Sequence, residues 1–130
     1  MACPQSSPPR AVLYVEDNEV NAMLMAALFQ RRPGLRLVLA GSGEEAVSVA
    51  RDLTPELLLL DLRLPDCHGG QLLPMLRLLP TCVVAPAIAV TAECDFDIAG
   101  TGFSELWAKP LDLGHVLRRL DELLGSPVTA

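Results

Sequence analysis

Residues 55–61 read PELLLLD, with four consecutive leucines between Glu56 and Asp61. Leucine favours helices, but a helix needs a longer segment than the one between Pro55 and Asp61. A strand buried on both faces accounts for a short apolar run without polar alternation. The sequence therefore predicts a central strand over residues 56–60, with the carboxylate of Asp61 directly after it.

Four other short segments have the same character. Residues 11–15, AVLYV, are apolar and stop at the acidic turn Glu16-Asp17-Asn18. Such runs between polar turns or prolines are typical of buried strands. The predicted strands are residues 11–15, 35–39, 56–60, 86–90 and 105–108.

Segments with helical spacing of apolar residues separate these strands. Ser42, followed three residues later by Glu45, forms a capping-box pattern at the start of one of them. Pro74 is acceptable inside another only if it lies in the first turn. The predicted helices cover about residues 20–31, 42–53, 72–79 and 112–124.

Five strands alternating with about five helices predict an α/β fold built from right-handed βαβ units. Its parallel sheet is expected to lie between two helical layers, as in doubly wound three-layer sandwiches. Residues 92–102 show no clear period, so a helix there is expected to be short, irregular or mobile. Folds of this class place their chemistry at the carboxyl ends of the strands.

The composition limits the classes of function. The chain has 130 residues and fits one domain, which we expect at residues 11–124, between a flexible leader (1–10) and a short tail (125–130). No apolar run approaches the roughly 18 residues of a membrane span. The leader has no signal-peptide core, so we expect a cytoplasmic protein without membrane contact.

Charge and cysteine content exclude further classes. The net charge is -6, and no helix carries a basic cluster, which argues against direct nucleic-acid binding. The four cysteines show no CxxC spacing and are expected to be reduced thiols. The neighbours Cys67 and His68 have no second pair of ligands, so they do not predict a metal site.

Useful polar groups follow four of the five predicted strands: Glu16 and Asp17, Asp61, Thr91, and Lys109. Three carboxylates in one pocket repel each other unless a cation lies between them. Oxygen ligands without His or Cys favour Mg²⁺, which leaves room for phosphate oxygens. Taken alone, Glu16 and Asp17 fit equally well a polar turn at a helix start.

Such a pocket suits phosphoryl transfer, which needs an in-line nucleophile and positive charge around the transferred oxygens. Asp61 is the best-placed nucleophile, because a carboxylate can form an acyl phosphate. Lys109 can supply positive charge, and the hydroxyl of Thr91 can donate a hydrogen bond to a phosphoryl oxygen.

Five sequence features occur in this order: Val15-Glu16-Asp17-Asn18, Leu60-Asp61-Leu62-Arg63-Leu64-Pro65, Gly69, Val90-Thr91-Ala92 and Lys109-Pro110. Through them, about residues 11–124 resemble the receiver domains of response regulators in two-component signalling, which include chemotaxis regulators. The resemblance implies a flavodoxin-like (βα)5 sandwich with a parallel five-stranded sheet in the order 2-1-3-4-5.

The resemblance also implies a role for each motif residue. It assigns Asp61 as phosphoacceptor, Glu16, Asp17, Asp61 and the backbone carbonyl of Arg63 as Mg²⁺ ligands, Thr91, Ala92 and Lys109 to phosphoryl recognition, and Pro110 as a cis-proline. The implied donor is a histidine kinase or a histidine phosphotransfer protein. The domain would signal through protein contacts, as a monomer or weak dimer, and catalyse only its own phosphorylation and dephosphorylation.

Two features depart from the family pattern. The switch position three residues before the lysine, usually aromatic, holds Leu106, and strand alternation points the neighbouring Trp107 to the opposite face. Signalling by the usual aromatic rotation is therefore not expected. The interval between Thr91 and Lys109 is shorter than is typical, which again indicates an irregular fourth helix.

Other interpretations were weighed against this one. A receiver-like interaction module that no longer signals by phosphorylation is the main alternative. An aspartate-nucleophile phosphatase would need a second acid where Arg63 stands, and a flavin phosphate would meet the acidic pair Glu16-Asp17. Arg63 and Glu93 could form an ion pair across the mouth of the pocket or remain solvated.

Overall fold

The computed structural model describes residues 10–93 and 95–125. Five parallel strands form one sheet in the order β2-β1-β3-β4-β5, which confirms the predicted fold class and strand order. The strands are β1 (Arg10–Val15), β2 (Leu35–Ala40), β3 (Leu57–Asp61), β4 (Ala87–Thr91) and β5 (Glu105–Ala108). The helices are α1 (Glu19–Phe29), α2 (Gly43–Ala50), α3 (Gly69–Arg77) and α4 (Leu113–Leu124), with a 3-10 turn at Pro80–Cys82.

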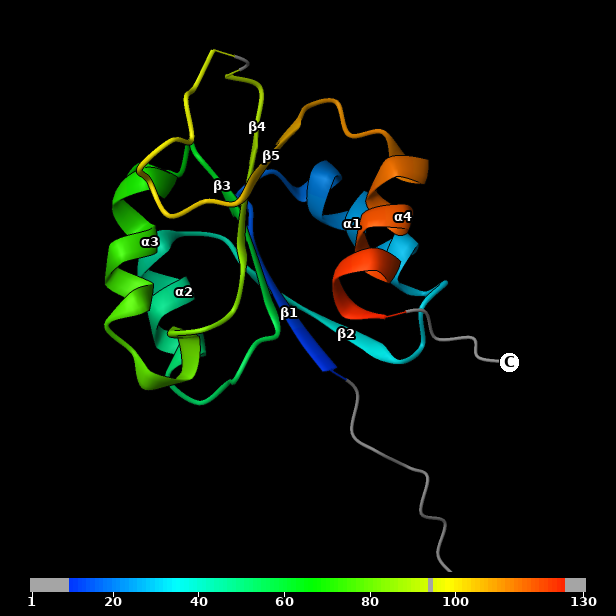
Figure 1. The fold of residues 1–130 in the computed structure, drawn as a ribbon, viewed down its shortest axis with the longest axis horizontal. Helices are drawn as coiled ribbons and strands as arrows, with labels where there is room; N and C mark the ends of the chain where they lie inside the picture. The colour runs from blue at the N-terminus through cyan, green and yellow to red at the C-terminus, as the bar shows by residue number, and fades with distance from the viewer. Residues whose placement is uncertain (1–9, 94, 126–130) are drawn as a thin grey trace, which may run out of the picture.

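Apolar burial produces three layers, with α2 and α3 on one face of the sheet and α1 and α4 on the other (Figure 1). The leucines of β3 serve both cores, because successive side chains of a strand point to opposite faces. Leu58 and Leu60 pack in the α2–α3 core, and Leu59 packs with Met25 of α1 in the other. Full burial of one such side chain contributes about 1.5 to 3 kcal/mol.

Polar side chains at the loop ends start the helices. Asn18, Ser42 and Asp112 are the N-caps of α1, α2 and α4, and each accepts a hydrogen bond from a backbone N–H of the first turn. His68 caps α3, where its Nδ1 accepts a hydrogen bond from the backbone N–H of Gly70 at 2.9 Å. The sequence had indicated two of these caps, Ser42 and Asp112. The reciprocal contact expected of a capping box at Ser42 is absent, because the Glu45 carboxylate accepts from the backbone N–H of Gly41 at 2.7 Å instead.

The expectation that Pro74 lies in a first helical turn is wrong. Helix α3 begins at Gly69, so Pro74 lies well inside it and supplies no N–H to the helical ladder. The apolar stripe from Leu72 onward located the start too late, because the cap and the two glycines before it carry no apolar signal. Helix α2 likewise ends at Ala50, before the predicted end near residue 53.

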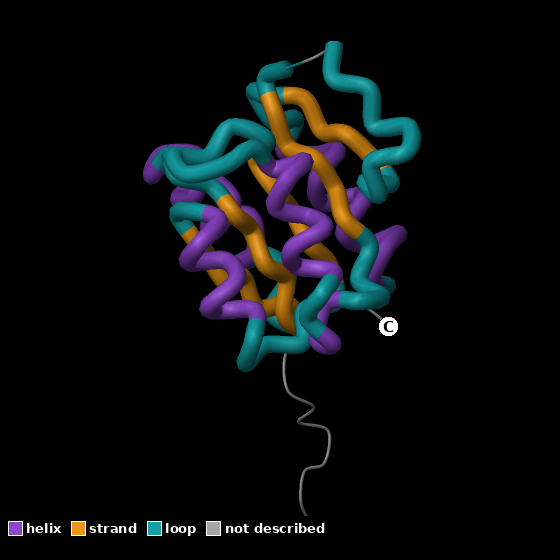
Figure 2. Tube along the Cα trace, turned by 90° about the vertical axis from the view of Figure 1, so that its left-hand side faces the viewer, coloured by secondary structure: helices purple, strands orange, loops and turns teal. Residues whose placement is uncertain are grey.

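The segment between β4 and β5 forms turns and no helix in its described residues, so the described part of the chain has four α-helices where about five were expected. Gly100 and Gly102 adopt φ of 75° and 96°, a conformation that helices exclude. Phe96, Ile98 and Phe103 of this segment pack against the α2–α3 core instead. Figure 2 shows the molecule from the side of α2 and α3, with the loops in teal.

The chain ends differ slightly from the expected boundaries. Strand β1 begins at Arg10 rather than at residue 11, because Arg10 pairs with Leu35 of β2. Residues 1–9 and 126–130, most of the expected leader and tail, lie outside the described residues. Within the described part, no helix is both long enough and apolar enough to cross a membrane.

The loop between β3 and α3 turns back tightly against the end of β3. The backbone N–H of Gly69 donates to the carbonyl of Leu62 at 2.8 Å, and a Cβ at Gly69 would lie 2.4 Å from the carbonyl oxygen of Asp61. In the same loop, Asp66 accepts two backbone hydrogen bonds at the start of α2, at 2.8 and 2.9 Å. Both contacts hold the loop that follows Asp61.

A Gly69→Ala substitution is expected to destabilise the fold by roughly 1 to 3 kcal/mol, because the added methyl group overlaps backbone that cannot move freely. Denaturant unfolding measures the change. Gly34→Ala is the matched control, since nothing lies within 4 Å of a Cβ at that position. Equal stabilities of the two variants would contradict the close approach at Gly69.

Candidate functional site

The turn after β1 holds two acidic side chains in different environments. The Glu16 side chain is 1% exposed, and its backbone N–H donates to the carbonyl of Ala40 at 2.9 Å, which prolongs the pairing of β1 with β2. Its Oε2 accepts a hydrogen bond from the backbone N–H of Asn18 at 3.1 Å. Asp17, the next residue, is exposed. The turn thus presents one fixed and one solvated carboxylate.

Asp61, the last residue of β3, is buried. Its Oδ1 accepts a hydrogen bond from the backbone N–H of Arg63 at 3.1 Å. Its Oδ2 accepts one from Nζ of Lys109 at 3.0 Å. The carboxylate is therefore oriented from two sides.

Lys109 follows β5 and reaches into the same region. Its backbone N–H donates to the carbonyl of Thr91 at 2.9 Å, which continues the pairing of β4 with β5. Its Nζ lies 2.7 Å from Oε1 of Glu16 and 3.0 Å from Oδ2 of Asp61. The ammonium group thus joins carboxylates from the carboxyl ends of two different strands, β1 and β3. The peptide bond between Lys109 and Pro110 is cis, the isomer that the resemblance implied.

Thr91, at the end of β4, is buried, and its Oγ1 accepts a hydrogen bond from the backbone N–H of Glu93 at 3.0 Å. The carboxylate of Glu93 lies 2.9 Å from Nε of Arg63 and 3.7 Å from Nε2 of His68. Of the two arrangements considered for Arg63 and Glu93, the structure has the ion pair. The Arg63 side chain is 79% exposed, so the pair contributes at most about 1 kcal/mol.

These side chains surround one open cleft of about 320 Å³ at the carboxyl ends of the strands. It is lined by Glu16, Asp17, Asn18, Asn21, Asp61, Arg63, Thr91, Ala92 and Lys109. Every residue that the sequence assigned to phosphate acceptance, metal binding or phosphoryl recognition lines this cleft.

The two residues discussed for switching lie elsewhere, on opposite faces of β5. Leu106 packs toward the α2–α3 core and Trp107 is buried in the α1–α4 core. This is the arrangement expected from strand alternation. The Trp107 ring lies against His115, with ring centroids 5.8 Å apart, and its Nε1 donates to Glu105 at 3.0 Å.

The buried charges shift one another's pKa values. Burial raises the pKa of Asp61, and the charge of Glu16 adds to the effect, while the hydrogen bonds to Asp61 offset it only in part. Burial acts in the same direction on Glu16, but its hydrogen bonds, above all from Lys109, outweigh it and lower the pKa. Burial would lower the pKa of Lys109, yet the two carboxylates raise it. Lys109 is therefore charged at neutral pH, and Glu16 is the stronger acid of the buried pair.

The acidic residues fit a hard divalent cation. One ligand oxygen from each of Glu16, Asp17 and Asp61 lies within 4.8 Å of the other two. Mg²⁺ binds oxygen at about 2.1 Å, so ligands on opposite sides of the ion lie about 4.2 Å apart. Three carboxylates and the ammonium of Lys109 leave a formal charge of minus two, which one divalent ion balances.

Sequence reasoning did not single out two residues that contribute to this site. Tyr14 was part of an apolar strand pattern, yet its hydroxyl donates to Oε1 of Glu16 at 2.9 Å. Asn21, in the first turn of α1, lines the cleft. The spacing of Tyr14 and Glu16 was the available signal, since residues two apart on a strand share a face.

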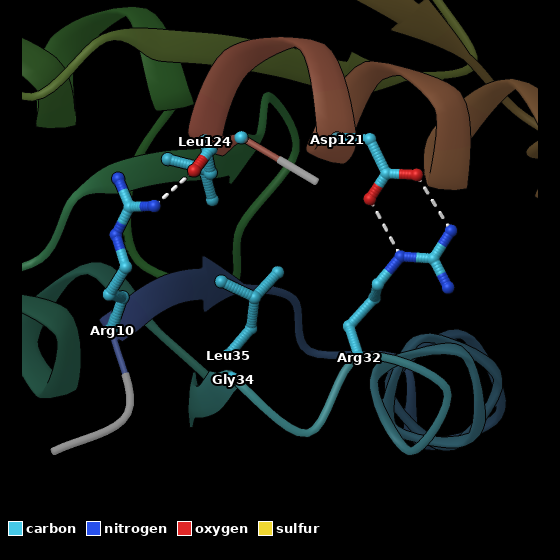
Figure 3. Close-up of a pocket in the computed structure, with 7 residues that line it drawn as sticks. Arg10, Arg32, Gly34, Leu35, Asp121 and Leu124 are labelled. Carbon is cyan, nitrogen blue, oxygen red and sulfur yellow. Dashed lines mark hydrogen bonds and ion pairs between the residues drawn. The ribbon is translucent and has the colours of Figure 1, made fainter. Parts of the chain in front are cut away.

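A second pocket, of about 150 Å³, lies at the other end of β1 and includes Arg10 and Arg32 (Figure 3). Arg32 pairs with Asp121 through two hydrogen bonds of 2.7 and 2.8 Å. Arg10 pairs with Glu56 at 2.9 Å and donates to the carbonyl of Leu124. Because each guanidinium has a carboxylate partner, the described residues of this pocket leave no unbalanced positive charge with which to bind an anion.

Comparison with known proteins gives consistent matches over most of the chain. Residues 12–121 match the family of response regulator receiver domains. The polar-differentiation response regulator DivK of Brucella anthropi is 31% identical over 122 residues, which is 91% of this chain and 98% of DivK. The histidine-protein kinase BarA of Escherichia coli is 32% identical over 105 residues, 78% of this chain but 11% of BarA.

Solved structures give the same result. The receiver domain of the sensor histidine kinase PA1611 from Pseudomonas aeruginosa has a TM-score of 0.79 and 30% identity, and the match covers 91% of this chain and 99% of that one. That structure has a magnesium ion coordinated in its active site cleft. The receiver domain of HemR from Leptospira biflexa, at 29% identity, has a TM-score of 0.74 and covers 94% and 98% of the two chains.

Replacing Asp61 by asparagine is expected to stabilise the metal-free fold at neutral pH. The pKa of Asp61 is raised in the fold, so its ionised form destabilises the native state at pH values above that raised pKa. The penalty fades as the pH falls toward the usual Asp pKa of about 4. The Tm of Asp61→Asn should exceed that of the wild type by a few degrees at pH about 7.5 and by less at pH about 4.5.

Thermal unfolding followed by circular dichroism, with chelator present, measures this difference. Asp52→Asn removes a charge from an exposed position and serves as the control for net charge. A gain in Tm that did not depend on pH, or that appeared equally in Asp52→Asn, would show that burial of the Asp61 carboxylate is not its source.

Proposed function

Because the chain belongs to the family of response regulator receiver domains, we propose that it is a phosphoacceptor switch of two-component signalling. Asp61 accepts a phosphoryl group from a histidine kinase or a histidine phosphotransfer protein in a Mg²⁺-dependent reaction. The observation that carries the proposal is the ammonium group of Lys109, which joins Glu16 and Asp61 in one acidic cleft at 2.7 and 3.0 Å.

In the transfer step, a carboxylate oxygen of Asp61 attacks the phosphorus atom of a phosphohistidine. The new P–O bond forms as the P–N bond breaks, and the electron pair of that bond stays on the imidazole nitrogen. Each Asp61 oxygen accepts one hydrogen bond from the described residues, so each keeps a lone pair for the attack. In hydrolysis, water attacks phosphorus and the P–O bond to Asp61 breaks, which releases phosphate and restores the carboxylate.

The surrounding groups stabilise the charge of the transferred phosphoryl group. Nζ of Lys109 already points at Oδ2 of Asp61 and is placed to donate to the phosphoryl oxygens. Thr91 accepts the backbone N–H of Glu93 at Oγ1, so its own hydroxyl proton is left to donate into the cleft, beside Ala92. These donors act in a partly buried site, where they are worth more than in water.

A bound magnesium ion would balance the remaining negative charge of the cleft. Its ligands would be the carboxylates of Glu16, Asp17 and Asp61 and the carbonyl of Arg63, all of which line the cleft. When bound, the ion supplies positive charge to the phosphoryl oxygens. The magnesium ion in the related PA1611 receiver supports this assignment.

A protein donor needs a surface next to the cleft, and helix α1 offers one. Val20, Met23 and Leu24 are 65%, 69% and 47% exposed, and α1 begins directly after the acidic turn. Leu24 also shares a small pocket of about 120 Å³ with Pro110 and Leu113. We assign the donor's docking site to this apolar strip.

The alternative of an interaction module without phosphorylation explains less. Such a module needs no converging carboxylates, whose repulsion destabilises the fold. In our proposal the domain catalyses only its own phosphorylation and dephosphorylation. Because Leu106 replaces an aromatic switch residue, the signal is expected to reach a protein partner by a route other than aromatic rotation.

Incubation with Mg²⁺ and acetyl phosphate should add one phosphoryl group to the wild-type protein. The added group should be absent in Asp61→Asn, because the amide is not a nucleophile for phosphorus. Intact-mass spectrometry of the acid-quenched reaction measures the occupancy.

Asp52→Asn is the matched control, since it removes an exposed carboxylate outside the cleft. Phosphorylation of this control together with failure of Asp61→Asn supports the proposal. An unmodified wild type, both with acetyl phosphate and with a phosphorylated histidine phosphotransfer protein, would favour the interaction module.

Mg²⁺ is expected to raise the Tm of the wild type by several degrees, because a ligand that binds only the native state stabilises it by about 2.7 kcal/mol at a hundredfold excess over Kd. Asp17→Asn should lose most of this rise while keeping its metal-free Tm, since Asp17 is exposed. Differential scanning fluorimetry with added Mg²⁺ or chelator measures both effects. An unchanged rise in Asp17→Asn, or the same loss in Asp52→Asn, would contradict the assigned ligand set.

A further inference from the structure

Tyr14 is the single tyrosine of the chain, and its side chain is fully buried in the α1–α4 core. Its hydroxyl group lies at the edge of that core, 2.9 Å from Oε1 of Glu16. A phenylalanine would fill the same apolar space. Packing therefore explains the ring of Tyr14 but not its hydroxyl group.

The two oxygens of the Glu16 carboxylate have different numbers of polar partners. Oε1 accepts a hydrogen bond from the hydroxyl of Tyr14 at 2.9 Å and forms an ion pair with Nζ of Lys109 at 2.7 Å. Oε2 accepts the backbone N–H of Asn18 at 3.1 Å. Because a carboxylate oxygen offers about two acceptor sites, Oε1 is full and Oε2 keeps a site for a cation.

Lys109 already pairs with two carboxylates, and phosphorylation of Asp61 would add further acceptors for its ammonium group. A phosphoryl group on Asp61 adds oxygens that compete for its ammonium group. Each contact that Lys109 makes with them weakens its hold on Oε1 of Glu16, and a buried carboxylate that loses donors becomes costly. The hydroxyl of Tyr14 faces no such competition.

We propose that Tyr14 is a positioning residue, which holds Oε1 of Glu16 and keeps Oε2 directed at the cation throughout the phosphorylation cycle. The inference rests on the proposed function, because it concerns the Mg²⁺ site of the same cleft. Without the hydroxyl, Lys109 alone fixes Oε1, and the carboxylate can turn when the ammonium moves.

Tyr14→Phe removes the hydroxyl and keeps the ring. Isothermal titration calorimetry with Mg²⁺ alone should show a Kd raised by roughly tenfold, the usual effect of losing a residue that orients a metal ligand. In phosphorylation by acetyl phosphate, the Mg²⁺ concentration for half-maximal rate should rise by a similar factor, while the rate at saturating Mg²⁺ changes less. A residue that only packs the core would move neither Mg²⁺ dependence.

Thr81→Val is the control for loss of a hydroxyl hydrogen bond, since Oγ1 of Thr81 donates to the carbonyl of Ala50 at 2.7 Å, outside the cleft. It should lower the Tm without changing the Kd for Mg²⁺. A wild-type Kd and a wild-type half-saturating concentration in Tyr14→Phe would overturn the positioning role. A wild-type protein that binds no Mg²⁺ would instead overturn the proposed function on which this inference rests.

A spectroscopic measurement on the wild type decides the matter even if Tyr14→Phe does not fold. Tyrosine labelled with ¹³C at Cζ gives one NMR signal, because the chain has one tyrosine. The signal should shift when Mg²⁺ is added and again when acetyl phosphate is added, as the hydroxyl takes a larger share of Oε1. A signal that stays in place through both additions, with Mg²⁺ binding shown by calorimetry, would contradict the inference.

Discussion

One ammonium group placed between two buried carboxylates organises this molecule. Nζ of Lys109 lies 2.7 Å from Glu16, which follows β1, and 3.0 Å from Asp61, which ends β3, while the lysine itself follows β5. The contact requires parallel strands with their carboxyl ends at one edge, and a buried β3 between the helical layers. It also requires the hydrogen bond from the backbone N–H of Lys109 to the carbonyl of Thr91, which places the lysine beside the two acids. The fold thus brings the carboxyl ends of β1, β3 and β5 together at one cleft.

The charges at that point are balanced only in part. Glu16 has enough hydrogen-bond donors to remain ionised in its buried position, whereas burial and the neighbouring charge raise the pKa of Asp61. The carboxylate assigned as nucleophile is therefore the one that the metal-free protein stabilises least. A divalent cation relieves this repulsion and a phosphoryl group changes it again, which gives a physical reason why the two events should be coupled in our proposal. Asp17 lies at the solvent side of the same cleft.

Much of this architecture could be predicted from the sequence because parallel strands leave a strong pattern. The leucine run before Asp61 located β3, and the alternation of segments predicted the sheet between two helical layers. The same reasoning misplaced the start of α3 and put Pro74 in a first turn, because a histidine cap and two glycines carry no apolar signal. Irregular structure before β5 was also predicted, because Gly100 and Gly102 interrupt any helical pattern, and the described residues of this segment form turns. The packing of Phe96, Ile98 and Phe103 against the α2–α3 core could not be predicted, since these side chains follow no period. The role of Tyr14 was not predicted, because its ring fits the pattern of an apolar strand. The contact between its hydroxyl group and Glu16 becomes visible only in the three-dimensional structure.

The most direct test of the central claim is a crystal structure of the protein grown with Mn²⁺ in place of Mg²⁺, with anomalous diffraction recorded at the manganese edge. We predict one strong anomalous peak in the cleft, within bonding distance of carboxylate oxygens from both the β1 loop and Asp61, with the Lys109 ammonium beside it. A peak outside the cleft, or bound by Asp17 alone with Glu16 and Asp61 turned away, would contradict a cation site built from two converging loops.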